Sequence, residues 1–192
     1  MAFRVSAILL AAGLSRRMGG DKLCLSYQGE TLISRAVNLL SKLPVFEKIL
    51  VATPERLETL IMPPDIRAVV NPTPDMGISG SLRLGLEPAT GDWYFFMTAD
   101  QPCLTVEDLA PLLESTASGK NNAIIYPVVN GNPCSPSLFS SCYREELLTL
   151  SGDSGGRVVR DMHPRACTGF TPKHPKNFLD VDNAEDYVNL CL

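Results

Sequence analysis

The sequence has no apolar stretch that approaches the roughly 20 residues needed by a membrane-spanning helix. Its opening residues include Arg4 but show no small-residue cleavage site ahead of the first glycine-rich stretch, as a secretory signal would. The 6 cysteines are widely spaced and form no C-x-x-C pair, which argues against a zinc ribbon and a small disulfide scaffold. We therefore expect a cytoplasmic protein with reduced thiols and no membrane partner.

The chain also lacks an excess of positive charge. Its 17 lysines and arginines are outnumbered by 21 aspartates and glutamates, which gives a formal net charge of −4. Binding nucleic acid over a broad face needs clustered basic side chains, so we expect no nucleic-acid partner. Histidine is scarce too: His163 and His174 have no Cys/His ligand cluster and are interpreted as surface residues. Any anionic ligand must therefore be bound by a local group of residues.

What the sequence does contain is a regular alternation of short apolar runs with longer segments of helical periodicity. The 192 residues, of which 45% are hydrophobic, are enough for one substantial core, so residues 1–192 are predicted to form a single domain. The alternation predicts an α/β fold of three α/β/α layers around a mainly parallel, Rossmann-like sheet. The predicted strands are 5–10, 48–53, 66–71, 93–98 and 122–129, and the predicted helices include 31–42, 54–61, 79–86 and one capped by Thr105 and Asp108.

Ligands of parallel sheets bind where loops leave the carboxyl ends of the strands. Four segments rich in glycine, proline or charge are candidates for such loops, and they span residues 11–22, 71–81, 99–103 and 179–186. We expect all four to face one crevice.

The first of these loops has the most unusual composition. It combines Gly13, Gly19 and Gly20 with two adjacent arginines and Lys22. Glycines let backbone N–H groups approach an anion, and cationic side chains neutralise its charge. The spacing matches neither the Walker motif G-x-x-x-x-G-K-[ST] nor the Rossmann motif G-x-G-x-x-G. From glycine spacing alone, a phosphate cradle and a solvated turn explain the loop equally well.

Five segments resemble, in the right order, signature motifs of the nucleotidyltransferases of the sugar-phosphate type, and most closely those of the molybdenum cofactor guanylyl- and cytidylyltransferases. The segments are LAAGLSRRMGGDK (10–22), NPTPDMGISGSLRLGL (71–86), TADQPCLT (98–105), SGDSGGRVV (151–159) and LDVDNAEDY (179–187). Each is weak alone, but together they cover nearly the whole chain. The resemblance implies an enzyme that transfers a nucleoside monophosphate to a phosphorylated acceptor and releases pyrophosphate.

The same resemblance separates the two branches of the family. Guanylyltransferases typically read L-A-G-G, whereas this chain has Leu10, Ala11, Ala12 and Gly13, which is similar to the cytidylyltransferases. The segment GISGSL favours the same branch. The resemblance thus implies transfer of CMP from CTP to molybdopterin carrying molybdenum, with a molybdoenzyme receiving the product. Two alternatives stay open: an enzyme of the same fold that uses GTP or another acceptor, and a non-catalytic protein that delivers the cofactor.

Acidic residues supply candidate metal ligands. Attack of one phosphate on another brings several negative charges together, which favours a divalent cation held by carboxylates. Mg²⁺ (or Mn²⁺) takes one or two protein carboxylates and completes its shell with phosphate oxygens and water. Asp100, at the end of an apolar strand, is the predicted first ligand and a catalytic residue, and the resemblance implies Asp182 as the second, with Asp180 in reserve. The alternative for each is a turn or helix-capping aspartate.

The resemblance also implies which residues bind the nucleotide. Arg17 and Lys22 would hold the β- and γ-phosphates and act on the departing pyrophosphate as catalytic residues. The backbone of residues 10–13 would line the edge of the base. Gly80 and Ser81, at the start of a helix, would read cytosine, and the alternative for them is an ordinary helical N-terminus.

Evidence for the acceptor site is thinner. Asp153 and Arg157 match the family's G-D-x-G-x-R loop, where an arginine would meet the pterin phosphate; a surface loop with an internal ion pair is the alternative. The motif around Ser135 differs from that of the family: this chain has Cys134-Ser135-Pro136 where cytidylyltransferases usually show G-H-P. A hydroxyl there replaces a ring that can stack and titrate, which leaves the identity of the acceptor open.

Overall fold

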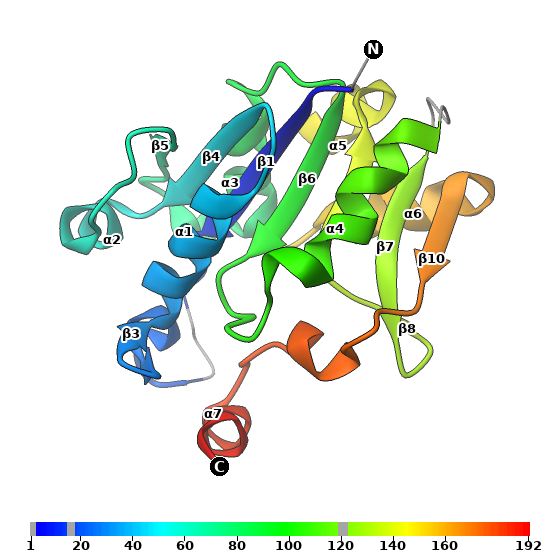
Figure 1. Cartoon of the computed structure of the whole chain (residues 1–192). Helices are drawn as coiled ribbons and strands as arrows, with labels where there is room; N and C mark the ends of the chain where they lie inside the picture. The colour runs from blue at the N-terminus through cyan, green and yellow to red at the C-terminus, as the bar shows by residue number, and fades with distance from the viewer. Residues whose placement is uncertain (1–2, 15–17, 119–122) are drawn as a thin grey trace.

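The computed structural model describes residues 3–14, 18–118 and 123–192. Its centre is an eight-stranded sheet in which seven strands follow the order β10-β7-β9-β6-β1-β4-β5 and β8 pairs with β7. Helices cover both faces of this sheet (Figure 1). The strands are β1 (Val5–Ala11), β4 (Glu47–Ala52), β5 (Arg67–Val70), β6 (Trp93–Thr98), β7 (Ile124–Val129), β8 (Asn132–Pro133), β9 (Ser137–Ser140) and β10 (Cys167–Phe170), with a separate hairpin of β2 (Ser26–Tyr27) and β3 (Glu30–Thr31).

The α-helices of the described residues are α1 (Leu32–Lys42), α2 (Pro54–Thr59), α3 (Ile78–Leu86), α4 (Val106–Glu114), α5 (Arg144–Leu148), α6 (Gly156–Met162) and α7 (Ala184–Cys191). The first four lie close to the helices predicted at 31–42, 54–61, 79–86 and after Thr105, whereas α5 was not predicted from the sequence. The predicted capping of α4 is confirmed, since Thr105 accepts from the backbone of Asp108 and Asp108 accepts from the backbone of Thr105. The α/β/α fold predicted from the sequence is therefore confirmed.

One strand has a direction that the alternation of strands and helices does not reveal. β9 runs antiparallel between β6 and β7, whereas β1 is parallel to both β4 and β6. The reversal follows from the connection: Asn130 and Gly131, both with positive φ, form a two-residue turn between β7 and β8. An antiparallel strand can follow such a tight turn, but a parallel neighbour needs a crossover.

Alternate residues of each central strand face two separate hydrophobic cores. In β1, Ala7 and Leu9 pack into the core under α1 and α4, whereas Ile8 packs into the core under α3, α5 and α6. All three are 0% exposed. Burying one Leu or Ile side chain contributes about 1.5–3 kcal/mol, so both cores hold the sheet rigid. This rigid sheet positions the loops at its carboxyl edge.

A glycine fixes the distance between α3 and the sheet. A Cβ built on Gly85 would lie 2.5 Å from Cγ2 of Ile8 and 3.1 Å from Cγ2 of Val51. Any side chain at position 85 would therefore push α3 away from β1 and β4. Because the N-terminus of α3 follows one of the four predicted loops, this close packing also positions that loop.

The C-terminal segment lies apart from the main sheet. Figure 1 shows α7 near the β2–β3 hairpin, away from both helical layers. The Tyr187 hydroxyl donates to the backbone oxygen of Ser26 at 2.5 Å, and no residue of α7 is buried. Tyr187 and Leu190 are partly buried against the main core, so α7 is attached to the domain by one edge.

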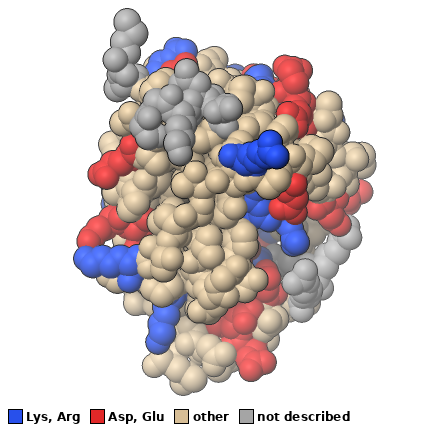
Figure 2. All heavy atoms as spheres, turned by 90° about the vertical axis from the view of Figure 1, so that its right-hand side faces the viewer, with Lys and Arg blue, Asp and Glu red and all other residues tan. Residues whose placement is uncertain are grey.

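The charges on one face and the lengths of the helices can be described directly. Figure 2 shows one face of the molecule, on which described lysines and arginines lie apart from one another among acidic side chains and do not merge into a continuous basic patch. Within the described ranges, none of the helices is both long and apolar enough to cross a lipid bilayer.

Candidate active site

A cleft of about 450 Å³ opens at the carboxyl ends of β1 and β6. The four loops predicted to converge all contribute to its wall. The lining residues include Gly13 and Lys22 from the first loop, Pro74, Gly77 and Ser81 from the second, Asp100 from the third and Asp182 from the fourth. Asp153, from the segment that precedes α6, also lines it.

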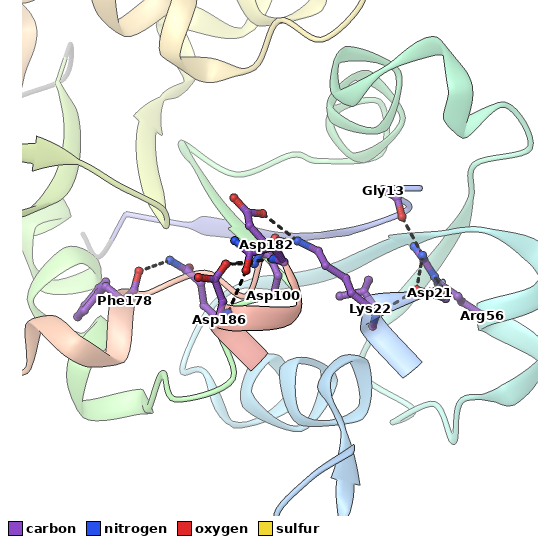
Figure 3. Close-up of polar contacts among 11 residues, drawn as sticks. Gly13, Asp21, Lys22, Arg56, Asp100, Phe178, Asp182 and Asp186 are labelled. Carbon is purple, nitrogen blue, oxygen red and sulfur yellow. Dashed lines mark hydrogen bonds and ion pairs between the residues drawn. The ribbon is translucent and has the colours of Figure 1, made fainter. Parts of the chain in front are cut away.

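Lys22 lies between two carboxylates in this cleft (Figure 3). Its Nζ is 2.7 Å from Asp100 Oδ2 and 3.1 Å from Asp182 Oδ1. Burial works against the charged ammonium, but the charges and hydrogen bonds of Asp100 and Asp182 outweigh it and raise the pKa of Lys22. Lys22 is therefore a positioned positive charge near neutral pH and cannot accept a proton there.

The carboxylate of Asp182 does not cap a helix. Asn183 is the N-cap of α7, where its side chain accepts from the backbone of Asp186 and Asp186 accepts from the backbone of Asn183. The backbone N–H of Asp182 also donates to Asp186 Oδ2, at 2.9 Å. These bonds orient the segment so that the Asp182 side chain, 49% exposed, reaches Lys22.

Asp100 has an environment that fits a divalent cation. Its Oδ2 binds Lys22, but its Oδ1 is enclosed and has no hydrogen-bond partner among the described residues. No three Asp, Glu, His or Cys side chains of the described residues form a metal site by themselves. Two carboxylates that leave room for phosphate oxygens and water match the ligand set that Mg²⁺ prefers. Asp100 and Asp182 are thus suited to a cation that arrives with a nucleotide.

Asp180 lies near the same pair of carboxylates. Removal of water by the surrounding protein, followed by the negative charges of Asp100 and Asp182, raises the pKa of Asp180 to about 7. Asp180 is an exposed residue, so solvent screens part of this effect. The chain segment is tied to the end of β6, because the backbone N–H of Val181 donates to the Asp100 carbonyl at 2.8 Å.

Buried polar contacts shape the second loop. The side-chain amide of Asn71 donates to the hydroxyl of Ser81 at 2.9 Å, and its oxygen accepts from the backbone of Thr73 at 3.0 Å. Gly77 has a φ of +88°, and a Cβ there would lie 2.4 Å from the carbonyl of Gly152. This glycine lets the second loop pack against the loop that carries Asp153.

The remaining predicted site residues lie in different surroundings. Ala11, Gly80, Ser135 and Arg157 are not among the lining residues of the cleft, whereas Leu10 and Ala12 are. The carbonyl of Ser135 accepts from the Gln101 side chain at 3.0 Å. The Arg157 side chain is 81% exposed and pairs with Asp161 at 3.4 Å, as the ion-pair alternative describes. The predicted phosphate contact Arg17 lies outside the described residues.

Two residues that sequence reasoning missed connect the loops of the cleft. Gln101, 4% exposed, donates from Nε2 to the carbonyls of both Ser135 and Phe178, and so joins the third loop to the segment before Asp182. Arg56, 6% exposed, binds Asp21 and two carbonyls of the first loop. The sequence alone marks neither residue as functional. Arg56 lies in a short helix with several charged residues, and Gln101 lies in a motif to which Asp100 already gives a role.

The sequence matches the profile of a known domain family. The profile is that of the MobA-like NTP transferase domain, and it matches residues 7–167. The chain is also 30% identical over 193 residues to a protein of Bacillus cereus named as a probable molybdenum cofactor guanylyltransferase, with 95% of this chain and 94% of the relative covered.

Solved structures with the same fold are more distant in sequence. The crystal structure of Rv0371c from Mycobacterium tuberculosis has a TM-score of 0.78 and 23% identity, and the match covers 100% of this chain and 99% of that one. A structure of Rv0371c in complex with manganese gives a TM-score of 0.75 at 21% identity, with 98% of each chain covered. At these identities, the likeness is evidence for the fold alone.

Proposed function

Because this chain belongs to the MobA-like NTP transferase family, we propose that it transfers CMP from CTP to the phosphate of molybdopterin carrying molybdenum and releases pyrophosphate. Membership also makes the chain an enzyme of the nucleotidyltransferase type, so a delivery protein without turnover is set aside. The names of its relatives support molybdenum cofactor as the acceptor and make GTP the second candidate nucleotide.

The arrangement of Lys22 with Asp100 and Asp182 carries the proposal. The reaction brings an attacking phosphate and a departing pyrophosphate together, so it needs positioned charge more than proton transfer. Lys22 keeps its proton near neutral pH and supplies that charge within the cleft. Arg17 would add a second positive charge to the triphosphate.

Asp100 and Asp182 would hold the divalent cation, Mg²⁺ or Mn²⁺. Such a cation supplies charge neutralisation of the phosphate oxygens when bound. The two carboxylates are already held together by Lys22, so their own mutual repulsion is offset before a cation arrives. The unpartnered Oδ1 of Asp100 is the oxygen that such a cation would satisfy.

The choice of CTP over GTP rests on Ala12. This residue is 1% exposed and lines the cleft where guanylyltransferases typically have glycine. A methyl group in place of glycine would leave less room for a base at this wall, which would favour the smaller pyrimidine ring. Leu10, Ala11 and Gly13 would contact the base edge through their backbones, and Gly80 with Ser81 would complete the base site.

The acceptor would lie on the side of the cleft that Asp153 lines. Ser135 and Arg157 remain proposed acceptor contacts, and neither lines the cleft. We further propose that residues 1–192 act as one domain in the cytoplasm and that a molybdoenzyme receives the product.

The deciding experiment supplies the purified protein with Mg²⁺, molybdopterin loaded with molybdate, and either CTP or GTP. We expect pyrophosphate release and a cytosine dinucleotide with CTP, and at least a tenfold lower kcat/KM with GTP. Mass spectrometry of the product identifies the base, and Asp100→Asn serves as the inactive control.

Three other results would change the assignment. A strong preference for GTP would make the chain a guanylyltransferase. Turnover only with a different phosphorylated acceptor would overturn molybdopterin. No pyrophosphate release with either nucleotide and any tested acceptor would overturn the proposed reaction.

A further inference from the structure

Arg56 is a buried arginine whose described side-chain hydrogen bonds all go to one loop. Its guanidinium donates to the carbonyl of Ala11 at 2.5 Å and to the carbonyl of Gly13 at 2.8 Å. It also forms a two-pronged pair with Asp21, in which Nε lies 2.8 Å from Oδ2 and Nη2 lies 2.7 Å from Oδ1. Figure 3 shows Arg56 joined to Gly13 and Asp21 on the side of the loop away from the acidic group around Lys22.

This arginine ties the beginning of the loop to its end. Ala11 is the last residue of β1, and Asp21 directly precedes Lys22. Asp21 Oδ1 also accepts from the backbone of Leu23 at 3.0 Å, which caps the single helical turn that begins at Lys22. The guanidinium therefore holds the backbone that carries Lys22 as well as the backbone that lines the cleft.

Asp21 is a true ionic partner in this contact. Burial alone would raise the pKa of Asp21, but the hydrogen bonds and charge of Arg56 outweigh it and lower the pKa. Burying an arginine is unfavourable unless its donors are satisfied, and here four of its five N–H donors bind the loop. A planar fork of donors is needed for this geometry, and a lysine ammonium cannot reproduce it.

The same bonds determine where the N–H groups of the loop point. In a planar trans peptide, the C=O of one residue and the N–H of the next point in opposite directions. Since the carbonyls of Ala11 and Gly13 point toward Arg56, the N–H groups of Ala12 and Leu14 point away from it. Ala12, Gly13 and Leu14 line the cleft, and Arg56 does not. By fixing the two carbonyls, Arg56 therefore also fixes the orientation of these two N–H groups in the wall of the cleft.

We propose that Arg56 is a positioning residue that holds the two described ends of the first loop, residues 11–14 and 21–22, in the arrangement that receives a nucleoside triphosphate, before the nucleotide binds. The inference rests on the proposed function, in which this loop is the nucleotide loop. Without Arg56, part of the binding free energy of the nucleotide would be spent on ordering the loop, which weakens nucleotide binding.

The test compares Arg56→Lys and Arg56→Ala with a matched control, Arg144→Lys. Arg144 also donates to backbone carbonyls, those of Glu87 and Ala89, and to the Tyr94 hydroxyl, but none of these three residues lines the cleft. Each variant is measured for thermal stability, for CTP and GTP affinity by calorimetry with Mg²⁺, and for the KM of nucleotide and of acceptor. Guanidinium ion at low millimolar concentration is added to Arg56→Ala as a rescue.

We expect Arg56→Lys to bind nucleotide about tenfold more weakly while the KM of the acceptor stays unchanged. Arg144→Lys should lose stability and keep wild-type nucleotide affinity. Guanidinium ion should restore part of the nucleotide affinity of Arg56→Ala and none in Arg144→Lys. If Arg56→Ala does not fold, Asp21→Asn replaces it, and the same weakening of nucleotide binding is expected.

Each contrary result identifies what fails. Wild-type nucleotide affinity in folded Arg56→Lys would overturn the positioning role and leave the proposed function intact. An equal loss of affinity in Arg144→Lys would show that Arg56 acts only through general stability. If the wild-type protein binds neither CTP nor GTP, both the proposed function and this inference are wrong. If it binds nucleotide but does not use molybdopterin, only the proposed acceptor is wrong.

Discussion

The two sides of the cleft are built in different ways. On one side, the first loop is held by Arg56, a buried side chain with four hydrogen bonds to that loop. On the other side, the segment around Asp182 is held by a backbone bond to Asp100 and by the bond from Gln101 to Phe178, and it continues into α7, which has no buried residue. We therefore expect the backbone that carries Lys22 to be held firmly, and the carboxylate of Asp182 to adjust more easily to a ligand.

The largest effects are expected when Asp100 and Asp182 are substituted separately. We expect Asp100→Asn to lower kcat for pyrophosphate release by about 10²–10³-fold, because Asp100 is the more enclosed carboxylate and faces the reacting phosphates. Asp182→Asn should lower it by only about tenfold, since the exposed segment can bring water to the cation instead. Circular dichroism melts check that both variants fold. Equal losses of kcat would contradict the smaller contribution expected from the exposed carboxylate of Asp182.

Removing Lys22 should expose its competition with a cation. In the absence of nucleotide, we expect Lys22→Met to bind Mn²⁺ about tenfold more tightly than the wild-type protein, because a positive charge no longer occupies the space between Asp100 and Asp182. Electron paramagnetic resonance of free Mn²⁺ measures this affinity directly. Turnover should nevertheless fall, since the charge on the departing pyrophosphate is no longer offset.

Lys48→Met is the matched control for that measurement. Lys48 is similarly enclosed, at 12% exposed, and its Nζ lies 2.6 Å from Asp65. An increase in Mn²⁺ affinity in this variant as well would indicate a general effect of net charge rather than a site shared by Lys22 and the cation.

The smallest expected effect is the change in the free energy of unfolding when Asp180 is substituted. The pKa of Asp180 is raised from 3.8 to about 7, so the folded protein holds a proton that the unfolded chain releases between these values. In metal-free buffer, the stabilisation by Asp180→Asn should be smallest near the unfolded pKa, grow as the pH rises toward about 7 and level off above it. Near pH 8, we expect about 1 kcal/mol, a value reduced because solvent screens this exposed residue.

Asp65 is the control for Asp180, because its pKa is shifted in the opposite direction. Hydrogen bonding to Lys48 lowers the pKa of Asp65, so the stability it provides is present above its unfolded pKa of 3.8 and lost as the pH falls through the lower folded value. Asp65→Asn should therefore destabilise the protein at neutral pH. Denaturant unfolding between pH 4 and 8 measures both variants, and a pH-independent difference for Asp180→Asn would contradict the raised pKa.

Local patterns in the sequence were enough to predict most of the secondary structure. The strand 93–98 was predicted at both of its ends, because six consecutive apolar or β-prone residues leave few alternatives. The capping of α4 by Thr105 and Asp108 is likewise a property of four neighbouring residues. The place of β9 between β6 and β7 could not be predicted in this way, because the neighbours of a strand in a sheet are set by segments far apart in the chain.

The candidate site shows the same division. Lys22 and Asp100 could be selected because each lies in a motif next to a predicted strand, and the order of strands in an α/β sheet brings such motifs to one edge. Arg56 and Gln101 could not, because an arginine or a glutamine acquires its role only from the carbonyls that surround it. Arg157 shows the converse: its motif was visible, but its side chain is 81% exposed and pairs with Asp161.

The sequence by itself determined the alternation of strands and helices, the loops that carry glycine and charge, and the family to which they belong, because these depend on residues close together in the chain. Only the tertiary structure decided that the Lys22 ammonium lies between carboxylates 78 and 160 residues further along the chain, and that Arg56 supports the loop that precedes Lys22. The reason is physical: the free energy of a buried charge depends on the partners that the fold brings within about 3 Å of it, and sequence neighbours do not specify those partners.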